Sequence, residues 1–316
     1  MTGAAEVKGW AQELGFLACG ITTPAPSERA AFFDEWLARG YGGTMRYLHR
    51  QARRRKDPRL IDPEARSVVV VLDNYYHGGG AGIDSDSTPV PDIRIAKYAW
   101  GADYHDVIGG RLRELADRLV ARGARHARVY ADAGPVPERE LAARAGLGWI
   151  GKNTMLVRPG AGSFFFIGSI FTDLELHPDA PFEGDRCGSC TRCLDACPTA
   201  AFVAPRVLDA TRCISYLTIE QKGPIPEALE PRLDGWAFGC DTCNDVCPWN
   251  VKFAEETSIA EYLPASMPPV AADTFEALDE AEFDERYRGT PFARPGLAGM
   301  RRNVRAAAAS RRMPSV

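Results

Sequence analysis

The chain has 316 residues, 45% of them hydrophobic and 25% charged, and a formal net charge of −4 at pH 7. This composition is typical of a globular protein with room for two domains. No apolar run is long enough to span a membrane, and residues 1–6 lack the basic and apolar regions of an export signal. The negative net charge also argues against indiscriminate nucleic-acid binding. We therefore expect a cytoplasmic protein without membrane association.

The first 178 residues alternate between helical and extended patterns. Apolar residues at helical spacing predict helices over 5–16, 27–39, 104–120 and 137–145. Short apolar runs predict strands at 67–72, 127–131, 155–157 and 163–171, with those at 67–72 and 127–131 buried, and the stretch 94–98 is expected to be extended. The stretch 77–91, rich in Gly, Ser, Asp and Pro, predicts a loop, and Cys19 is expected to be a buried core thiol. The pattern predicts an α+β (mixed α/β) domain over residues 1–178.

One glycine motif in this half comes close to a phosphate-binding loop. Gly146, Gly151 and Lys152 match G-x4-G-K, but Asn153 stands where a hydroxyl should hold magnesium, and a predicted helix precedes the motif. The sequence also contains no G-x-S-x-G elbow and no H-E-x-x-H zinc helix. A nucleotide-hydrolysing or other hydrolytic function therefore has little support.

Eight of the nine cysteines lie between residues 187 and 247. The first four follow the C-x2-C-x2-C-x3-C-P spacing of bacterial ferredoxins, in which the fourth cysteine ligates the other cluster. The last four repeat this spacing more loosely, and Pro248 again follows the final cysteine. By the same crossover, one [4Fe-4S] cluster is predicted on Cys187, Cys190, Cys193 and Cys247. The other is predicted on Cys197, Cys213, Cys240 and Cys243, which places a ferredoxin-like two-[4Fe-4S] domain at 179–252.

Eight cysteines could also serve two other purposes. Two structural zinc sites would also take eight thiolates, but they do not require the x2, x2, x3-Pro spacing. A disulfide framework fits poorly with a long chain that lacks a signal peptide. Iron-sulfur clusters remain the favoured prediction.

Residues 253–316 form a third region, predicted as a short helical and basic C-terminal segment. Ten acidic residues and no Lys or Arg lie between 254 and 285, whereas eight arginines and no acid follow from Arg286. A second basic stretch runs from Arg50 to Arg59. Such runs are usually solvated faces, but together they allow an anionic partner such as RNA.

Two clusters attached to a larger domain imply delivery of single electrons to a redox cofactor or substrate held by the first 180 residues. A flavin, a corrinoid or a haem would serve, and the sequence pattern does not decide between them. Asp132, at the end of a predicted strand, is the candidate proton donor, although it could simply be a turn or N-cap residue. The pairs Tyr104-His105 and Lys152-Asn153 leave the same choice between chemistry and packing.

The chain resembles the epoxyqueuosine reductase family along most of its length. The matching blocks are Gly40–Leu48, Trp100–His105, Asp132–Val136, Ala145–Thr154, Gly162–Gly168, the run from Cys187, Ile214–Glu220 and Phe238–Asn250. The resemblance implies an oxidoreductase that reduces the epoxide of epoxyqueuosine to the alkene of queuosine at the tRNA wobble position. It also implies that electrons pass through two [4Fe-4S] clusters to cobalamin, which has no histidine ligand from the protein.

The resemblance also implies roles for particular residues. Asp132 matches the proton donor of the family. The expected cofactor-binding residues are Tyr104, His105, Trp149, Gly151, Lys152, Asn153, Thr154 and Ser163. The expected tRNA phosphate contacts are Arg53, Arg54, Arg301 and Arg302. An external low-potential electron donor would complete the system, and we expect a monomer.

Two rival functions remain at this stage. A corrinoid iron-sulfur reductive dehalogenase would share the cofactors, although the sequence has no twin-arginine signal. A non-catalytic iron-sulfur electron carrier or RNA-binding protein would carry clusters without corrinoid and would not need Asp132.

Overall fold

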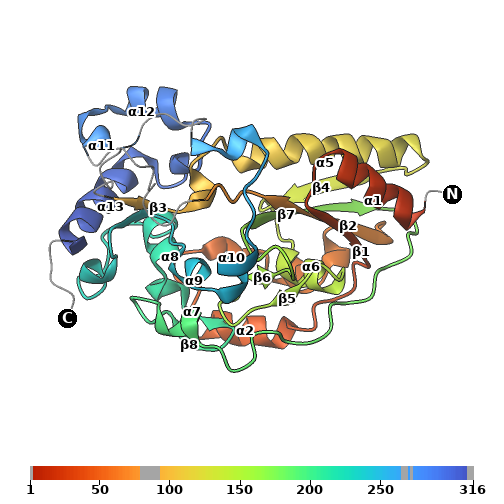
Figure 1. The fold of residues 1–316 in the computed structure, drawn as a ribbon, viewed down its shortest axis with the longest axis horizontal. Coiled ribbons are helices and arrows are strands. Elements are labelled where there is room, and N and C mark those ends of the chain that lie inside the picture. The colour runs from red at the N-terminus through yellow and green to blue at the C-terminus, as the bar shows by residue number, and fades with distance from the viewer. Residues whose placement is uncertain (1–2, 79–92, 265–269, 271–272, 312–316) are drawn as a thin grey trace.

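The computed structural model describes residues 3–78, 93–264, 270 and 273–311 (Figure 1). The helices are α1 (Ala4–Glu13), α2 (Ala30–Ala38), α3 (Arg46–Arg50), α4 (Ala52–Lys56), α5 (Tyr104–Ala121), α6 (Glu138–Arg144), α7 (Arg192–Asp195), α8 (Ile214–Ile219), α9 (Thr242–Asp245), α10 (Pro248–Phe253), α11 (Thr274–Ala277), α12 (Glu280–Tyr287) and α13 (Gly296–Arg311). The strands are β1 (Ala18–Thr22), β2 (Ser67–Asn74), β3 (Arg94–Ile95), β4 (Ala127–Ala131), β5 (Trp149–Ile150), β6 (Leu156–Val157), β7 (Phe165–Thr172), β8 (Phe202–Ala204), β9 (Val207–Leu208) and β10 (Trp236–Phe238).

A four-stranded antiparallel sheet in the order β1-β2-β7-β4 forms the centre of the N-terminal half. Strand β2 is buried on both faces, because Val69 and Val71 face one core and Val68 and Val70 face the other. Helices α1 and α5 cover the first face and α6 covers the second (Figure 1). Mixed α and β structure is therefore confirmed for this half.

Close packing of α5 on β7 depends on a glycine. A Cβ at Gly168 would lie 2.7 Å from the Leu112 side chain and 3.1 Å from that of Ile108. Both Leu112 and Ile108 are fully buried. The glycine thus lets α5 approach the sheet, and this fixes the position of Tyr104 at the first turn of that helix.

Two local predictions were wrong. The stretch 94–98 is not one extended segment, because β3 ends at Ile95 and a 3₁₀ turn covers Lys97–Ala99. The strand at 127–131 is not buried as predicted, because β4 is the outer strand of the sheet and most of its residues are partly accessible. Most of the predicted loop at 77–91 lies outside the described residues.

The cysteine-rich part is joined to the N-terminal half by main-chain pairing. Strand β10 pairs in parallel with β3, so Trp236 lies opposite Arg94 and Phe238 opposite Ile95. The C-terminal helices α12 and α13 pack on the same region through an aromatic core. That core contains Ile93, Ile95, Phe238, Phe275, Phe283, Tyr287, Phe292, Leu297, Met300 and Val304. The three predicted regions are therefore in extensive contact.

Candidate active site and cluster domain

Asp132 follows β4 directly, at the edge of the sheet. Its backbone φ is +50°, a left-handed conformation that aspartate adopts more readily than most residues. The side chain does not cap α6, whose N-cap residue is Pro137. Instead, the Tyr104 hydroxyl donates a hydrogen bond of 2.5 Å to Asp132 Oδ2. The exposed carboxyl is thus held in position by the first turn of α5.

Two residues that the sequence did not reveal support the loop after Asp132. Glu138 Oε1 accepts a hydrogen bond of 2.6 Å from the Asp132 backbone N–H. From α4, the Arg55 guanidinium donates to the carbonyls of Gly134 and Val136, at 3.0 and 3.5 Å. Burial and the nearby Asp132 charge raise the pKa of Glu138 to about 8. No local pattern would have identified either residue, since both contacts depend on the tertiary fold.

A stack of rings forms the wall beside Asp132. Tyr104 lies parallel to Phe166 at 4.3 Å between ring centroids, and His105 stacks on Tyr104 at 4.2 Å. His105 Nδ1 lies 2.7 Å from Asp103 Oδ1, and this interaction raises the pKa of His105. Because the Asp103 side chain also accepts the His105 N–H, Asp103 caps the helix. The Tyr104 side chain takes no part in this cap, and its hydroxyl bonds to Asp132.

Tyr98 connects this wall to the cysteine-rich part. Its ring lies 5.9 Å from that of Tyr104 and 6.0 Å from that of Phe238, two residues before Cys240. Next to it, the buried Lys97 ammonium lies 2.6 Å from Asp245 and 3.8 Å from Asp241. The Asp132 site and the second group of cysteines are therefore separated by only a few side chains.

The influence of the thiols on one another's pKa divides the eight cysteines into two sets, although within the described residues no three His, Cys, Asp or Glu side chains are arranged to hold a metal ion. Burial is the main cause that raises the pKa of Cys193 to about 11. The nearby thiols of Cys247, Cys187 and Cys190 raise it further. Burial is also the main cause of the raised pKa of Cys243. Further contributions come, in decreasing order, from Cys240, Cys213, Asp241 and Cys193. Cys197 likewise raises the pKa of Cys213. These neighbours are those of the predicted crossover. Cys193 also contributes to the raised pKa of Cys243, so the two sets influence each other.

The comparisons with known proteins give the chain its family. Residues 186–250 match the family described as "4Fe-4S double cluster binding domain", and residues 55–133 match "Epoxyqueuosine reductase QueG, DUF1730". An epoxyqueuosine reductase from Pseudomonas aeruginosa is 41% identical over 95% of this chain and 83% of its own length. One from Leadbetterella byssophila is 40% identical over 95% of this chain and 96% of its own length. The chain belongs to the epoxyqueuosine reductase family.

Solved structures of the family agree with this assignment. A crystal structure of epoxyqueuosine reductase with an epoxyqueuosine-modified tRNA-Tyr stem loop has a TM-score of 0.83 and 31% identity, covering 97% of this chain and 80% of that one. The structure from Streptococcus thermophilus has a TM-score of 0.85 and 27% identity, covering 98% and 82%. The chain is therefore an oxidoreductase with a double [4Fe-4S] domain, and neither rival function is favoured.

Several residues expected to bind the cofactor contact the cluster domain. Trp149 Nε1 donates to Cys187 Sγ at 3.4 Å, and Lys152 Nζ donates to the carbonyls of Gly188 and Cys190 at 2.7 and 2.9 Å. Asn153 and Ser163 are almost fully buried. Their side chains bond to Asn244, and Ser163 also bonds to Asn250. These four side chains hold the two halves of the protein together.

Two other expected cofactor residues lie at the turn between β5 and β6. A Cβ at Gly151 would lie 2.8 Å from the Asn153 side-chain oxygen and 3.1 Å from the Val157 side chain, so glycine leaves room for these two side chains at the turn. Thr154 has a left-handed φ of +67°, and its carbonyl accepts a 2.7 Å bond from Arg139 on α6. The turn is thus fixed to the helix that also carries Glu138.

The arginines expected to contact tRNA fall into two classes. Arg53 and Arg54 on α4 are exposed, and neither side chain makes a hydrogen bond or ion pair within the described residues. Arg301, in contrast, donates to the carbonyls of Phe275, Glu276 and Leu278. Arg302 donates to those of Leu217, Gln221 and Gly223. Both guanidinium groups of α13 are thus engaged inside the protein, and their geometry does not favour the expected phosphate contacts.

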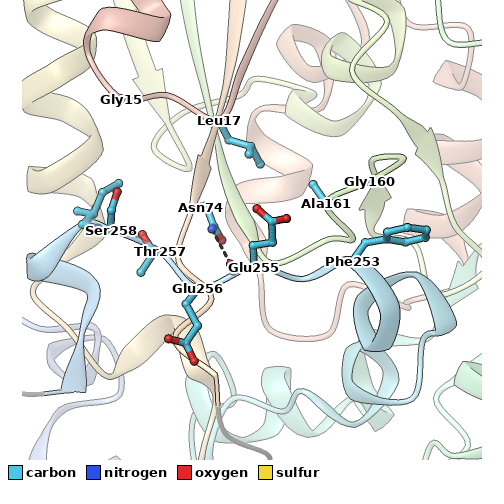
Figure 2. Close-up of a pocket in the computed structure, with 11 residues that line it drawn as sticks. Gly15, Leu17, Asn74, Gly160, Ala161, Phe253, Glu255, Glu256, Thr257 and Ser258 are labelled. Carbon is cyan, nitrogen blue, oxygen red and sulfur yellow. Dashed lines mark hydrogen bonds between the residues drawn. The ribbon is translucent and has the colours of Figure 1, made fainter.

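A cavity of about 220 Å³ lies elsewhere (Figure 2). It is bounded by Leu17, the end of β2 at Asn74, the turn at Gly160 and Ala161, and residues 253 and 255–259. Asn74 Nδ2 donates to the Glu255 carbonyl at 2.8 Å across one wall. The volume is below the range of about 300–1,000 Å³ typical of small-molecule sites, and no predicted site residue lines it. Within the described residues, no helix is both long and apolar enough to cross a membrane.

Proposed function

We propose that this chain reduces the epoxide of epoxyqueuosine to the alkene of queuosine at the wobble position of tRNA. The observation that carries the proposal is the exposed Asp132 carboxyl, held by Tyr104 at a sheet edge that adjoins the cluster domain. A relative in this family has been solved with an epoxyqueuosine-modified tRNA stem loop, and another with its catalytic aspartate loop swung out of the active site. Both descriptions fit the location of Asp132.

The reaction requires two electrons and two protons. Both C–O bonds of the epoxide break, a C=C bond forms between the two carbons, and the oxygen leaves as water. The electrons reach the chain one at a time from an external donor of low potential. Because an alkoxide is a poor leaving group, each C–O cleavage is easier when an acid protonates the oxygen.

We propose that the eight cysteines hold the two clusters by crossover ligation. One ligand set is Cys187, Cys190, Cys193 and Cys247, and the other is Cys197, Cys213, Cys240 and Cys243. The grouping of the thiols supports this division. N–H···S contacts from Trp149 to Cys187 and from the Ala201 backbone to Cys197 suit thiolate ligands, whose negative charge they stabilise.

The residues around Asp132 also fit a large planar cofactor. An accessible carboxylate stands beside the stacked rings of Phe166, Tyr104 and His105, and Tyr98 leads from there to the cluster domain. We propose that cobalamin binds between these two parts, with Tyr104 and His105 on its substrate side and the turn at Gly151 and Thr154 at its border. When bound, cobalamin supplies the low-potential electrons that open the epoxide.

In this proposal Asp132 donates a proton to the departing oxygen. Tyr104 holds the carboxyl toward the site through its 2.5 Å bond, and Phe166 keeps the Tyr104 ring in place. Arg53 and Arg54 contact phosphates of the anticodon stem loop. An unstacked wobble nucleotide, as single-stranded RNA loops allow, brings the epoxide to Asp132.

The test is anaerobic turnover of epoxyqueuosine-modified tRNA with added cobalamin and a strong reductant, followed by mass spectrometry of the nucleosides. We expect the wild type to remove one oxygen in a cobalamin-dependent reaction. Asp132→Asn should lower the rate about 10²–10⁴-fold, the usual contribution of a general acid, with iron and cobalamin content unchanged. The matched control is Asp117→Asn, an exposed aspartate on α5. Full cofactor loading without queuosine formation would refute the proposed substrate.

A further inference from the structure

Helices α3 and α4 form an almost continuous segment with an exposed basic face. Gln51 joins them, because its N–H donates to the Tyr47 carbonyl and its carbonyl accepts the Arg55 N–H, each at 3.0 Å. The basic face consists of exposed side chains that make no hydrogen bond or ion pair within the described residues: Arg46, His49, Arg50, Arg53 and Arg54. Because these charges are not used inside the protein, the face is suited to RNA phosphates.

Arg55, on the same helix turn as Arg53 and Arg54, points into the protein instead. It is half-buried, and its guanidinium donates to the carbonyls of Gly134 at 3.0 Å and, more weakly, Val136 at 3.5 Å. Its Nε is buried and has no hydrogen-bond partner within the part of the chain that the structure describes. A guanidinium turned inward in this way is committed to residues 132–136, the Asp132 loop, and not to phosphates at the surface.

The Asp132 loop depends on side chains from outside itself. Asp132 and Gly134 both have left-handed backbone conformations, with φ of +50° and +125°. For a residue other than glycine this conformation persists only where the surroundings hold it. Tyr104 holds the Asp132 carboxyl and Glu138 holds its N–H, whereas Arg55 holds the carbonyls beyond it. Among these side chains, Arg55 is the one whose helix also carries the basic face.

The C-terminal end of α4 is fixed to the rest of the protein. Lys56 Nζ lies 2.7 Å from Asp34 Oδ2 on the neighbouring α2, and the Lys56 carbonyl accepts the Ser27 N–H at 2.8 Å. The Ser27 hydroxyl in turn donates to the Glu140 carboxyl on α6 at 2.5 Å. A helix of one turn is marginal by itself, so its contacts decide how firmly it is held. Phosphates bound to the exposed arginines would add contacts on the side of α4 that now has none.

We propose that Arg55 is a positioning residue that aligns the Asp132 loop when RNA phosphates occupy Arg53 and Arg54. The proposal rests on the proposed function and deepens it, because it ties the RNA that carries the epoxide and the acid that opens it to one helix. Bound phosphates offset the repulsion between adjacent cations and hold α4 in place, and Arg55 then holds the loop carbonyls. A displacement of about 1 Å can cost about 100-fold in rate, so a small shift of the loop matters for catalysis.

Amide exchange of the loop tests the proposal without turnover. Hydrogen–deuterium exchange is followed by mass spectrometry on the cofactor-loaded full chain, with and without an unmodified anticodon stem loop at a concentration that saturates each variant. In the wild type, RNA should slow exchange over residues 132–136 at least about fivefold, the lower end of typical coupling between sites. Arg55→Ala should lose this effect, and so should Arg53→Ala combined with Arg54→Ala.

Two further variants make this result specific. Arg66→Ala removes an exposed arginine that pairs with Glu175 at the opposite end of the sheet from Asp132, so it should respond to RNA as the wild type does. Arg55→Lys keeps the charge but replaces the forked guanidinium with a single ammonium, so protection of the loop should fall although the charge is unchanged. Wild-type protection in Arg55→Ala would mean that RNA covers the loop directly. That result, or a wild-type loop that exchanges equally fast with and without RNA, would overturn the proposal.

Turnover separates alignment of the loop from RNA binding. With the epoxyqueuosine-modified stem loop, Arg55→Ala should lower kcat about 10–100-fold and raise KM by less, because the RNA still binds while the loop is misplaced. Arg53→Ala combined with Arg54→Ala should raise KM as strongly as it lowers kcat, since binding and alignment both suffer. If queuosine forms and Arg55→Ala keeps the wild-type kcat, the proposed function stands and the role of Arg55 fails. If RNA slows exchange as expected but no queuosine forms, the proposed substrate fails and the link between α4 and the loop stands.

Discussion

Glu138 links the chemistry of the site to the stability of the fold. In the folded chain burial holds its pKa near 8, against an ordinary value of 4.5. Between these values the folded state binds more protons than the unfolded state, so stability falls as the pH rises. The contribution of Glu138 is therefore complete below about pH 4.5 and is lost progressively up to about pH 8.

A thermal melt of Glu138→Gln tests this linkage. The variant lacks the titrating group, so its melting temperature minus that of the wild type should be several degrees larger at about pH 8 than at about pH 5. All other titrating groups are common to both proteins and cancel in this difference. Glu140→Gln should show no such change with pH. Parallel curves for Glu138→Gln and the wild type would mean that Glu138 is ionised in the folded protein at neutral pH.

At the scale of elements, Asn250 on α10 is the main connection between the cluster domain and the turn before β7. Its Oδ1 accepts the Ser163 N–H at 2.6 Å, and its Nδ2 donates to the Ser163 hydroxyl and the Asn244 carbonyl at 2.9 and 2.8 Å. The side chain is almost fully buried, at 4% exposure. It also lies three residues after Cys247, one of the proposed cluster ligands. Loss of Asn250 should therefore disturb that ligand as well as the fold.

We predict that Asn250→Ala lowers stability by about 1–3 kcal/mol, because it leaves the buried Ser163 N–H without its acceptor. Iron content after anaerobic purification should fall, with the loss concentrated in the cluster that Cys247 would hold. Val251→Ala is the control, since this neighbouring side chain is 72% exposed. Calorimetry and iron analysis of the two variants provide the comparison. An Asn250→Ala protein with full iron content and wild-type stability would show that Asn250 is not a structural connection between the two parts.

Elements whose formation depends on local sequence were predicted well. The run Val68–Leu72 is apolar enough to form a buried strand in any sheet, and it lies at the centre of β2. The cysteine spacing likewise predicts iron-sulfur clusters without knowledge of the fold. The match to the double-cluster family over residues 186–250 confirms a [4Fe-4S] domain there. The extended segment expected at 94–98 was wrong in its second half because pairing with β10, a contact of distant segments, decides where β3 ends. Such pairing leaves no local signal.

The candidate site likewise combines features that the local sequence predicts with features that depend on tertiary contacts. Asp132 could be nominated because it follows a strand and because its neighbours match a family, whereas Glu138 and Arg55 act through contacts that only the tertiary fold creates. Lys152 and Asn153 stood out as a glycine-flanked pair and were expected to bind the cofactor. Their side chains also reach the cysteine loops, because β5 and β6 place this turn against the cluster domain. A motif identifies an unusual turn without saying what it touches.

At the scale of the whole molecule, the proposed contacts with tRNA phosphates depend on which arginines are engaged within the protein. The basic C-terminal helix α13 looks from its sequence like a phosphate-binding segment. In the structure, however, Arg301 and Arg302 bond to carbonyls of residues 217–223 and 275–278, which fastens α13 to α8 and α11. The Asn303 side chain adds a bond of 2.6 Å to the Thr218 carbonyl. The exposed arginines of α4 lie next to Arg55, which contacts the Asp132 loop, so they are well placed to hold RNA over the site.

Salt dependence of tRNA binding separates these two groups of arginines. Each phosphate contact to single-stranded RNA adds about 0.7 to the slope of log K against log salt concentration. Arg53→Ala combined with Arg54→Ala should therefore reduce the slope by about 1.4 and weaken binding most at low salt. Arg302→Ala should leave the slope unchanged but lower the melting temperature by several degrees, because it frees three carbonyls from their donor. Filter binding of the modified stem loop at several salt concentrations, with melts of the same samples, measures both. If Arg302→Ala reduced the slope while the α4 variant did not, the grip would lie on α13, and the RNA would have to reach Asp132 from the C-terminal side of the molecule.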